Sequence, residues 1–185
     1  MVVASLAPLI ASDQGPPVTR PVDFPSEYAS EADRKVVASL LDRLPKTAFT
    51  VVVRDEAGVP VVIRNAPLEA DGTPMPTRYW LIGPLQIEVV GHLEAAGGVR
   101  RAQVELDPLL IQSTHERHAV FRDAQLPAAW SGHRPAGGVA GTRRGVKCLH
   151  AHYACWLAGE DDVVGAWVAS TLADELPKVN RCVPE

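Results

Sequence analysis

Aromatic residues and cysteines are scarce in this chain of 185 residues, in which Phe, Tyr and Trp together make up 5%. The three cysteines form an odd set without regular spacing. Small secreted proteins held by disulfides usually carry an even set, so this count argues against a disulfide framework and favours a reducing compartment. The chain is long enough to bury a core without such crosslinks, and we expect a cytoplasmic protein.

The chain also lacks an excess of basic residues and any long hydrophobic run. Its formal net charge of −4 excludes nucleic-acid binding by the protein as a whole and restricts any anion site to a local patch. A membrane-spanning helix needs about twenty consecutive apolar residues, and no segment reaches that length. The apolar segment 1–12 has no Lys or Arg ahead of it, so we expect neither an export signal nor a membrane partner.

The remaining composition is that of an ordinary globular protein, with 46% hydrophobic and 22% charged residues. We expect a disordered or extended lead-in over residues 1–25, where prolines are frequent. Residues 26–176 carry the periodic patterns of one globular domain, and residues 177–185 form a C-terminal tail.

The first half of that domain predicts a helix followed by a small sheet. Ser30 can cap a helix that Pro45 ends. Two β-branched runs, Phe49–Arg54 and Pro60–Arg64, are separated by a turn signal and indicate a hairpin. Arg78–Ile82 can add a third strand, without which the hairpin would be marginal.

The second half is mostly helical. The patterns predict helices over residues 84–97, 99–106, 107–124, 147–158 and 163–175. Residues 126–147 have no periodicity and many Gly and Pro residues, and a run of that length is either functional or disordered. The predicted fold class is α+β, mostly helical, with a small antiparallel sheet packed against about five helices.

The stretch from Gly137 to Cys155 concentrates glycines, cations, cysteines and histidines. If its helix begins near Lys147, then Cys148, His152 and Cys155 lie on one face at i, i+4 and i+7, and His150 points to the other side. With His115 from the preceding helix, this face could bind zinc or iron. The alternative is that these cysteines and histidines are packed, hydrogen-bonded core residues.

Two segments indicate binding of a small anion, either phosphate or carboxylate. Arg143, Arg144 and Lys147 converge on the start of a helix, whose N-terminus favours negative charge. The glycines among them could turn backbone N–H groups toward the same anion. Arg78, which stands beside two aromatic residues, could line a pocket for a planar or anionic ligand.

Three segments together resemble an uncharacterised bacterial family, domain of unknown function 501. They are Gly72-Thr73-Pro74-Met75-Pro76-Thr77-Arg78-Tyr79-Trp80-Leu81, Leu93-Glu94-Ala95-Ala96-Gly97 and Val146-Lys147-Cys148-Leu149-His150-Ala151. The resemblance emphasises Thr77, which joins the candidate anion-binding residues, together with the following positions: Glu94, His115, Glu116, Lys147, Cys148 and His150. Many relatives carry a Cys in the first hairpin, where this chain has Asp55-Glu56-Ala57-Gly58. If that Cys were a metal ligand, this chain would lack it.

Two functional hypotheses follow. In the first, the protein is a small hydrolase of phosphate or acyl groups, in which Cys148 and His150 hold a metal or form a thiolate–imidazole pair. His115 or Glu116 would be the general base. In the second, the protein is a non-enzymatic regulator that binds a protein partner, and its cysteines and histidines are structural. The resemblance links such a regulator to cell division or phosphate metabolism only by association.

Overall fold

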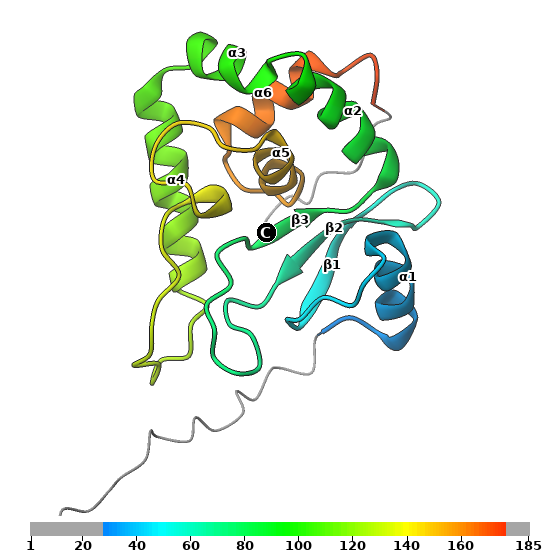
Figure 1. The fold of residues 1–185 in the computed structure, drawn as a ribbon, viewed down its shortest axis with the longest axis vertical. Coiled ribbons are helices and arrows are strands. Elements are labelled where there is room, and N and C mark those ends of the chain that lie inside the picture. The colour runs from blue at the N-terminus through cyan, green and yellow to red at the C-terminus, as the bar shows by residue number, and fades with distance from the viewer. Residues whose placement is uncertain (1–27, 177–185) are drawn as a thin grey trace, which may run out of the picture.

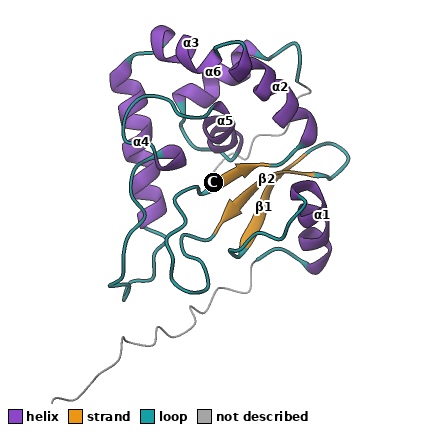
Figure 2. Cartoon of the chain, in the orientation of Figure 1, coloured by secondary structure: helices purple, strands orange, loops and turns teal. Residues whose placement is uncertain are grey.

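A computed structural model describes residues 28–176, so the predicted lead-in and tail lie outside the described residues. The chain forms a three-stranded antiparallel sheet in the order β1-β2-β3, with helices on both of its faces (Figures 1 and 2). The strands are β1 (Phe49–Arg54), β2 (Pro60–Asn65) and β3 (Tyr79–Leu81). The α+β fold class, the hairpin and its third strand are therefore confirmed.

One face of the sheet is covered by a single helix, α1 (Glu31–Leu41). Ser30 caps it as predicted, because its hydroxyl oxygen accepts from the Asp33 N–H at 3.1 Å. Val37 of this helix packs against Phe49 and Ile63 of the sheet, in a small hydrophobic cluster separate from the main core.

The other face of the sheet carries the remaining helices and the main core. They are α2 (Pro84–Ala95), α3 (Gly98–Glu105), α4 (Pro108–Asp123), the short 3₁₀ helix η1 (Val139–Gly141), α5 (Leu149–Leu157) and α6 (Val163–Thr171). Asp107 and Asp162 cap α4 and α6 by accepting from backbone N–H groups of the first turn. No helix in the range 28–176 is long and apolar enough to cross a membrane.

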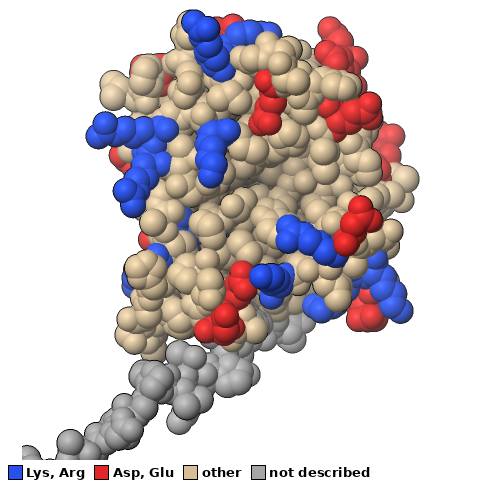
Figure 3. All heavy atoms as spheres, in the orientation of Figure 1, with Lys and Arg blue, Asp and Glu red and all other residues tan. Residues whose placement is uncertain are grey.

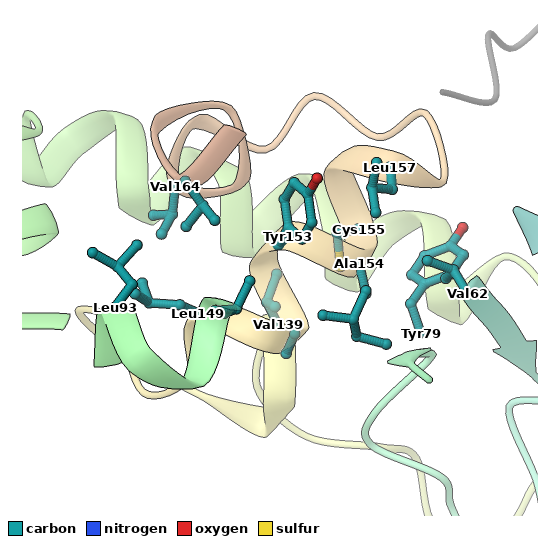
Figure 4. Packing of buried hydrophobic residues seen from close by; sticks show 14 of the residues in the cluster. Val62, Tyr79, Leu93, Val139, Leu149, Tyr153, Ala154, Cys155, Leu157 and Val164 are labelled. Atoms are coloured by element: carbon teal, nitrogen blue, oxygen red, sulfur yellow. The ribbon is translucent and has the colours of Figure 1, made fainter. Parts of the chain in front are cut away.

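The central element of this layer is α5, which contacts β3, α2, η1 and α6. Its residues are buried nearly all around the helix, as expected for a helix surrounded by other elements. Figure 4 shows side chains of α5, among them Leu149, Tyr153 and Leu157, packed between Leu93 and Val164 near one end and Val62 and Tyr79 near the other. The two ends of α5 therefore face different parts of the molecule, and the candidate sites lie there.

Candidate functional site

The start of α5 differs from the prediction in a way that changes the site. The helix begins at Leu149, and Cys148 precedes it in extended conformation with φ −152° and ψ 120°. Cys148 therefore does not share the helical face of His152 and Cys155. The prediction that His150 points to the other side depended on a helix that begins near Lys147, and with the later start the Cys148 Sγ lies 3.9 Å from the His150 Nδ1.

Glu94, near the end of α2, completes a group with Cys148 and His150 that we call the Glu94 cluster. The Glu94 Oε1 lies 3.2 Å from the His150 Nδ1. The same carboxylate accepts a hydrogen bond from the Leu149 N–H, so it also holds the first turn of α5 against α2. One ligand atom from each of the three residues lies within 4.8 Å of the others, and all three residues are half-buried.

A hydrogen bond of its second ring nitrogen, Nε2, orients the His150 ring. Its Nε2 lies 3.1 Å from the carbonyl oxygen of Ile87, which can only accept, so Nε2 carries the proton. The lone pair of the neutral ring is then on Nδ1, facing Cys148 and Glu94. Cys148 is the largest of the causes that raise the pKa of His150 to about 9, followed by the Ile87 carbonyl and Glu94, against the opposing effect of burial. The site therefore favours a positive charge between its three donor atoms.

A second group, formed by His118, Cys155 and Glu160, is buried beneath the far end of α5. Here the His118 Nδ1 donates to the Glu160 Oε2 at 2.8 Å, and the Cys155 Sγ lies 3.7 Å from the same nitrogen. Burial raises the pKa of the Cys155 thiol well above its ordinary value, with Glu160 and Asp162 adding to the effect. His118, Cys155 and Glu160 therefore form a polar network in the core, in which a protonated thiol lies beside a carboxylate–imidazole hydrogen bond.

The remaining predicted metal ligands are held elsewhere. His152 is fully buried, and its Nδ1 donates to the Asp162 carboxylate at 2.8 Å, which ties α5 to the cap of α6. The His115 Nδ1 accepts from the Val139 N–H at 3.1 Å and its Nε2 donates to the Gly145 carbonyl at 2.7 Å. The four residues that one alternative placed in a single metal site therefore have different partners: the Cys148 Sγ lies beside His150 and the Cys155 Sγ beside His118. The rings of His115 and His152 lie 5.4 Å apart, but the hydrogen bonds described above engage their nitrogens elsewhere.

His115 fastens the glycine-rich loop to α4. A Cβ on Gly138 would lie 2.4 Å from the His115 Cβ, so this glycine permits the close approach. Burial lowers the pKa of His115, which keeps the ring neutral while both nitrogens are engaged with the backbone. This arrangement favours a structural role for His115 over its predicted role as a general base in catalysis.

The glycine-rich loop uses its backbone donors within the protein. The N–H groups of Gly138, Val139, Gly141 and Thr142 all donate to loop carbonyls or to His115. The loop as folded therefore does not present them as an anion-binding nest. Its glycines instead permit left-handed turns, for example at Gly141 with φ 69°.

The predicted cations divide between surface and core. Arg143, Arg144 and Lys147 are exposed on the loop before α5, and none forms an ion pair with another described residue. Arg78 is 3% exposed and stacks on aromatic rings.

Of the other predicted residues, Thr77 offers its backbone carbonyl to the Asn65 side chain. Glu116 is exposed, accepts from Gln112 and lines a cavity of about 340 Å³ with His115 and Arg143, a cavity that Lys147 and Cys148 do not line.

Reasoning from residue patterns did not place Glu94 or the Ile87 carbonyl beside Cys148 and His150. Glu94 stands on a helix with an exposed face, where the residue pattern allowed either a carboxylate of a second site or a solvated side chain, and the family resemblance gave it further emphasis. A backbone carbonyl such as that of Ile87 leaves no trace in a sequence. Figure 3 shows the molecular face above α5 and β3, which is hollowed near its centre and carries charged side chains mainly around its rim.

Comparison with known proteins agrees with the resemblance. The chain belongs to the family described as protein of unknown function (DUF501), which matches residues 51–170. Neither the curated proteins nor the solved structures include a match to this chain.

Proposed function

We propose that this member of the DUF501 family is a metal-dependent hydrolase whose zinc or iron ion is held by the Glu94 cluster. The observation that carries the proposal is the convergence of three electron-pair donors, Glu94 Oε1, Cys148 Sγ and His150 Nδ1, within 4.8 Å. Atoms of this kind repel one another unless a cation or a shared proton lies between them, and the raised pKa of His150 reflects the same preference for positive charge. Thiolate, imidazole and carboxylate are together the usual ligands of zinc.

The distances support one shared ion. Zinc lies about 2.3 Å from sulfur and about 2.0–2.2 Å from nitrogen or oxygen, so tetrahedral coordination separates S from N by about 3.6 Å and N from O by about 3.3 Å. The corresponding distances are 3.9 Å and 3.2 Å in the Glu94 cluster. The N–O separation of 3.2 Å fits a hydrogen bond as well as a shared ion, whereas the 2.8 Å separation in the buried cluster is shorter than tetrahedral zinc coordination gives.

The surroundings of His150 also support a metal ligand. A histidine that binds a metal through one nitrogen usually donates from the other to a carbonyl or carboxylate, which fixes the ring and its tautomer. The Nε2–H of His150 donates in this way to the Ile87 carbonyl. The ring would therefore keep its orientation on binding an ion, which would displace the proton that a pKa of about 9 keeps on the ring near neutral pH.

A site of three protein ligands and partial exposure favours catalysis over a closed structural role. Side-chain exposure is 25% for His150 and 27% for Glu94, which leaves a direction open to solvent. A zinc ion with three protein ligands keeps a fourth position for water and lowers the pKa of that water to about 7. The exposed Lys147, next to Cys148, would attract the negative group of a phosphate or carboxylate substrate.

The first test is metal content and hydrolysis, measured on untagged protein purified without chelator. We expect close to one equivalent of zinc or iron, and metal-dependent hydrolysis of p-nitrophenyl phosphate or p-nitrophenyl acetate. Glu94→Gln, Cys148→Ser and His150→Ala should each remove most of the metal and the activity. Cys155→Ala is the matched control, because its thiol belongs to the buried network, and it should retain both.

Folded protein without metal would contradict the metal centre, provided that added zinc also fails to bind. Stoichiometric metal without hydrolysis of either ester would retain the metal centre and contradict the hydrolase. Lys147→Gln separates substrate binding from metal binding, since it should raise KM for the phosphate ester while metal content stays unchanged.

A second candidate function, a non-enzymatic protein that binds a protein partner, is favoured by the outer surface of α4. Leu109 and Val120 of this helix are 76% and 72% exposed, which is unusual for large apolar side chains on one element. The double variant Leu109→Asp/Val120→Asp should leave metal content and hydrolysis unchanged if the protein is a hydrolase. A loss of biological function in that variant, with the metal centre intact, would favour the partner-binding function.

A further inference from the structure

A second cavity lies at the opposite end of α5 from the Glu94 cluster, and we call it the Tyr79 cavity. Its volume is about 350 Å³, within the range of small-molecule sites. It opens between the sheet, α4 and the loop that follows α5. The residues that matter for its chemistry are Arg64, Tyr79, Arg117, Phe121, Glu160 and Asp161.

Two aromatic rings, with a buried cation between them, give the cavity its apolar surface. Tyr79 is 4% exposed, whereas Phe121 is 41% exposed. The Arg78 guanidinium stacks between them, 5.7 Å from the Tyr79 ring and 4.9 Å from the Phe121 ring. The Arg78 Nε is buried without a hydrogen-bond partner among the described residues. The positive charge of Arg78 therefore lies against both rings, and it favours a negative or electron-rich group on their other side.

Two of the four charged residues that line the cavity, Arg117 and Asp161, neutralise each other. Arg117 pairs with the Asp161 carboxylate at 3.2 Å and also donates to its backbone carbonyl. Glu160 accepts from His118 beneath the cavity. The Arg117–Asp161 pair is complete without a ligand, and the Glu160 carboxylate adds negative charge to that wall of the cavity.

Arg64 is the exception. It lies directly across from Tyr79 in the β2–β3 register, so the two side chains stand on the same face of the sheet. The Arg64 side chain is half-buried and forms no hydrogen bond or ion pair with any residue in the range 28–176, although its charge acts on the nearby Tyr28 hydroxyl. A guanidinium of this kind at the edge of an apolar cavity is a donor available to a carboxylate or phosphate.

We infer that the Tyr79 cavity binds an amphipathic anion, with its apolar body against Tyr79 and Phe121 and its single anionic group on Arg64. The ligand class is that of aromatic or branched aliphatic carboxylates and phosphates of small size. The site is separate from the Glu94 cluster, because α5 separates the two by its full length.

The test uses 2-naphthoate as the probe, with naphthalene-2-methanol as a neutral compound of the same shape, titrated by calorimetry into full-length protein. We expect naphthoate to bind with one site and to perturb the backbone amide signals of Tyr79 and Gly159 in NMR spectra. Arg64→Gln should weaken binding about tenfold or more, since the lost interaction is a charge-assisted hydrogen bond. Phe121→Ala should also weaken it, without unfolding the protein, because this ring is partly exposed.

Arg34→Gln is the matched control, since Arg34 is an exposed arginine of α1 on the other face of the sheet. Arg34→Gln and Cys148→Ser should both leave naphthoate binding unchanged. Equal affinity for the neutral alcohol, or undiminished binding in Arg64→Gln, would overturn the proposed anion site. Absence of naphthoate binding to the wild-type protein would overturn the inference altogether.

Discussion

The partners of its two ring nitrogens determine whether a histidine of this protein is a candidate metal ligand. In His118 and His152, Nδ1 donates to a carboxylate and the buried Nε2 has no partner among the described residues. In His115, both nitrogens are engaged by backbone groups. His150 alone among these four combines partial exposure with an Nδ1 that faces a thiol and a carboxylate. That combination sets His150 apart as the candidate ligand.

The neutral state of His115 predicts a pH dependence of stability. Because burial lowers its folded pKa below the ordinary value of about 6.5, the unfolded chain takes up the proton first as the pH falls. The contribution of His115 is therefore complete above pH 6.5 and is lost on acidification, by at most about 1.4 kcal/mol per pH unit.

Urea unfolding between pH 7.5 and 5.5 measures this effect. The free energy of unfolding of wild type should fall toward that of His115→Gln as the pH is lowered. A difference between the two proteins that stays constant over this range would show that His115 does not titrate as burial requires.

The elements were predictable because their patterns are local. Phe49–Arg54 and Pro60–Asn65 have the β-branched composition and turn of a hairpin, and Asp107-Pro108 begins α4 as a cap and first helical residue should. The start of α5 was missed by two residues. That small error moved Cys148 from the predicted face of His152 to a position beside His150.

The junction of α5 with α6 depends on one buried carboxylate. Asp162 accepts from both His152 and the Gly165 N–H, so it holds a neighbouring helix and caps its own. Asp162→Ala should lower the free energy of unfolding by about 2–4 kcal/mol, the sum of a lost cap and an unsatisfied buried donor. Asp162→Asn keeps the cap oxygen and should cost less. Equal losses in denaturant titrations of the two variants would contradict the role of the cap.

Two glycines should respond to alanine in opposite directions. At Gly138 a Cβ would lie 2.4 Å from the His115 Cβ, so Gly138→Ala should destabilise the protein by about 1–3 kcal/mol. At Gly91, inside α2, the nearest atom would be the His150 Nε2 at 3.9 Å, an ordinary contact. Gly91→Ala should therefore stabilise the protein by up to about 1 kcal/mol through helix propensity. Thermal unfolding of both variants checks the pair, and destabilisation by Gly91→Ala would indicate that His150 is displaced.

Across the whole molecule, α5 joins two sites whose residues come from distant parts of the sequence. The Glu94 cluster brings α2 to the start of α5, and the Tyr79 cavity brings the sheet and α4 to its end. Sequence patterns identified Cys148, His150 and Arg78 as candidates but could not pair them with Glu94, Arg64 or Phe121. Such pairings depend on helix packing and strand register, which local patterns do not determine.

A metal that bridges α2 and α5 should stabilise the whole fold. At zinc concentrations about 100-fold above the dissociation constant, the gain is about 2.7 kcal/mol, which corresponds to roughly 5–10 °C in Tm for a protein of this size. We expect added zinc to raise the Tm of metal-free wild type, and a chelator to reverse the shift. His150→Ala should show no shift. A wild-type Tm that does not respond to zinc would argue against a bridging ion.

The most direct test of the proposed metal centre is a titration of the metal-free protein with Co²⁺, followed by absorption spectroscopy. A cobalt–thiolate bond produces a charge-transfer band in the near ultraviolet. The proposed centre predicts that this band appears with one equivalent of Co²⁺, that Cys148→Ser abolishes it, and that Cys155→Ala leaves it intact. A band that survives Cys148→Ser and disappears in Cys155→Ala would place the metal in the buried cluster. That result, or no band at all, would contradict a metal centre at Glu94, Cys148 and His150.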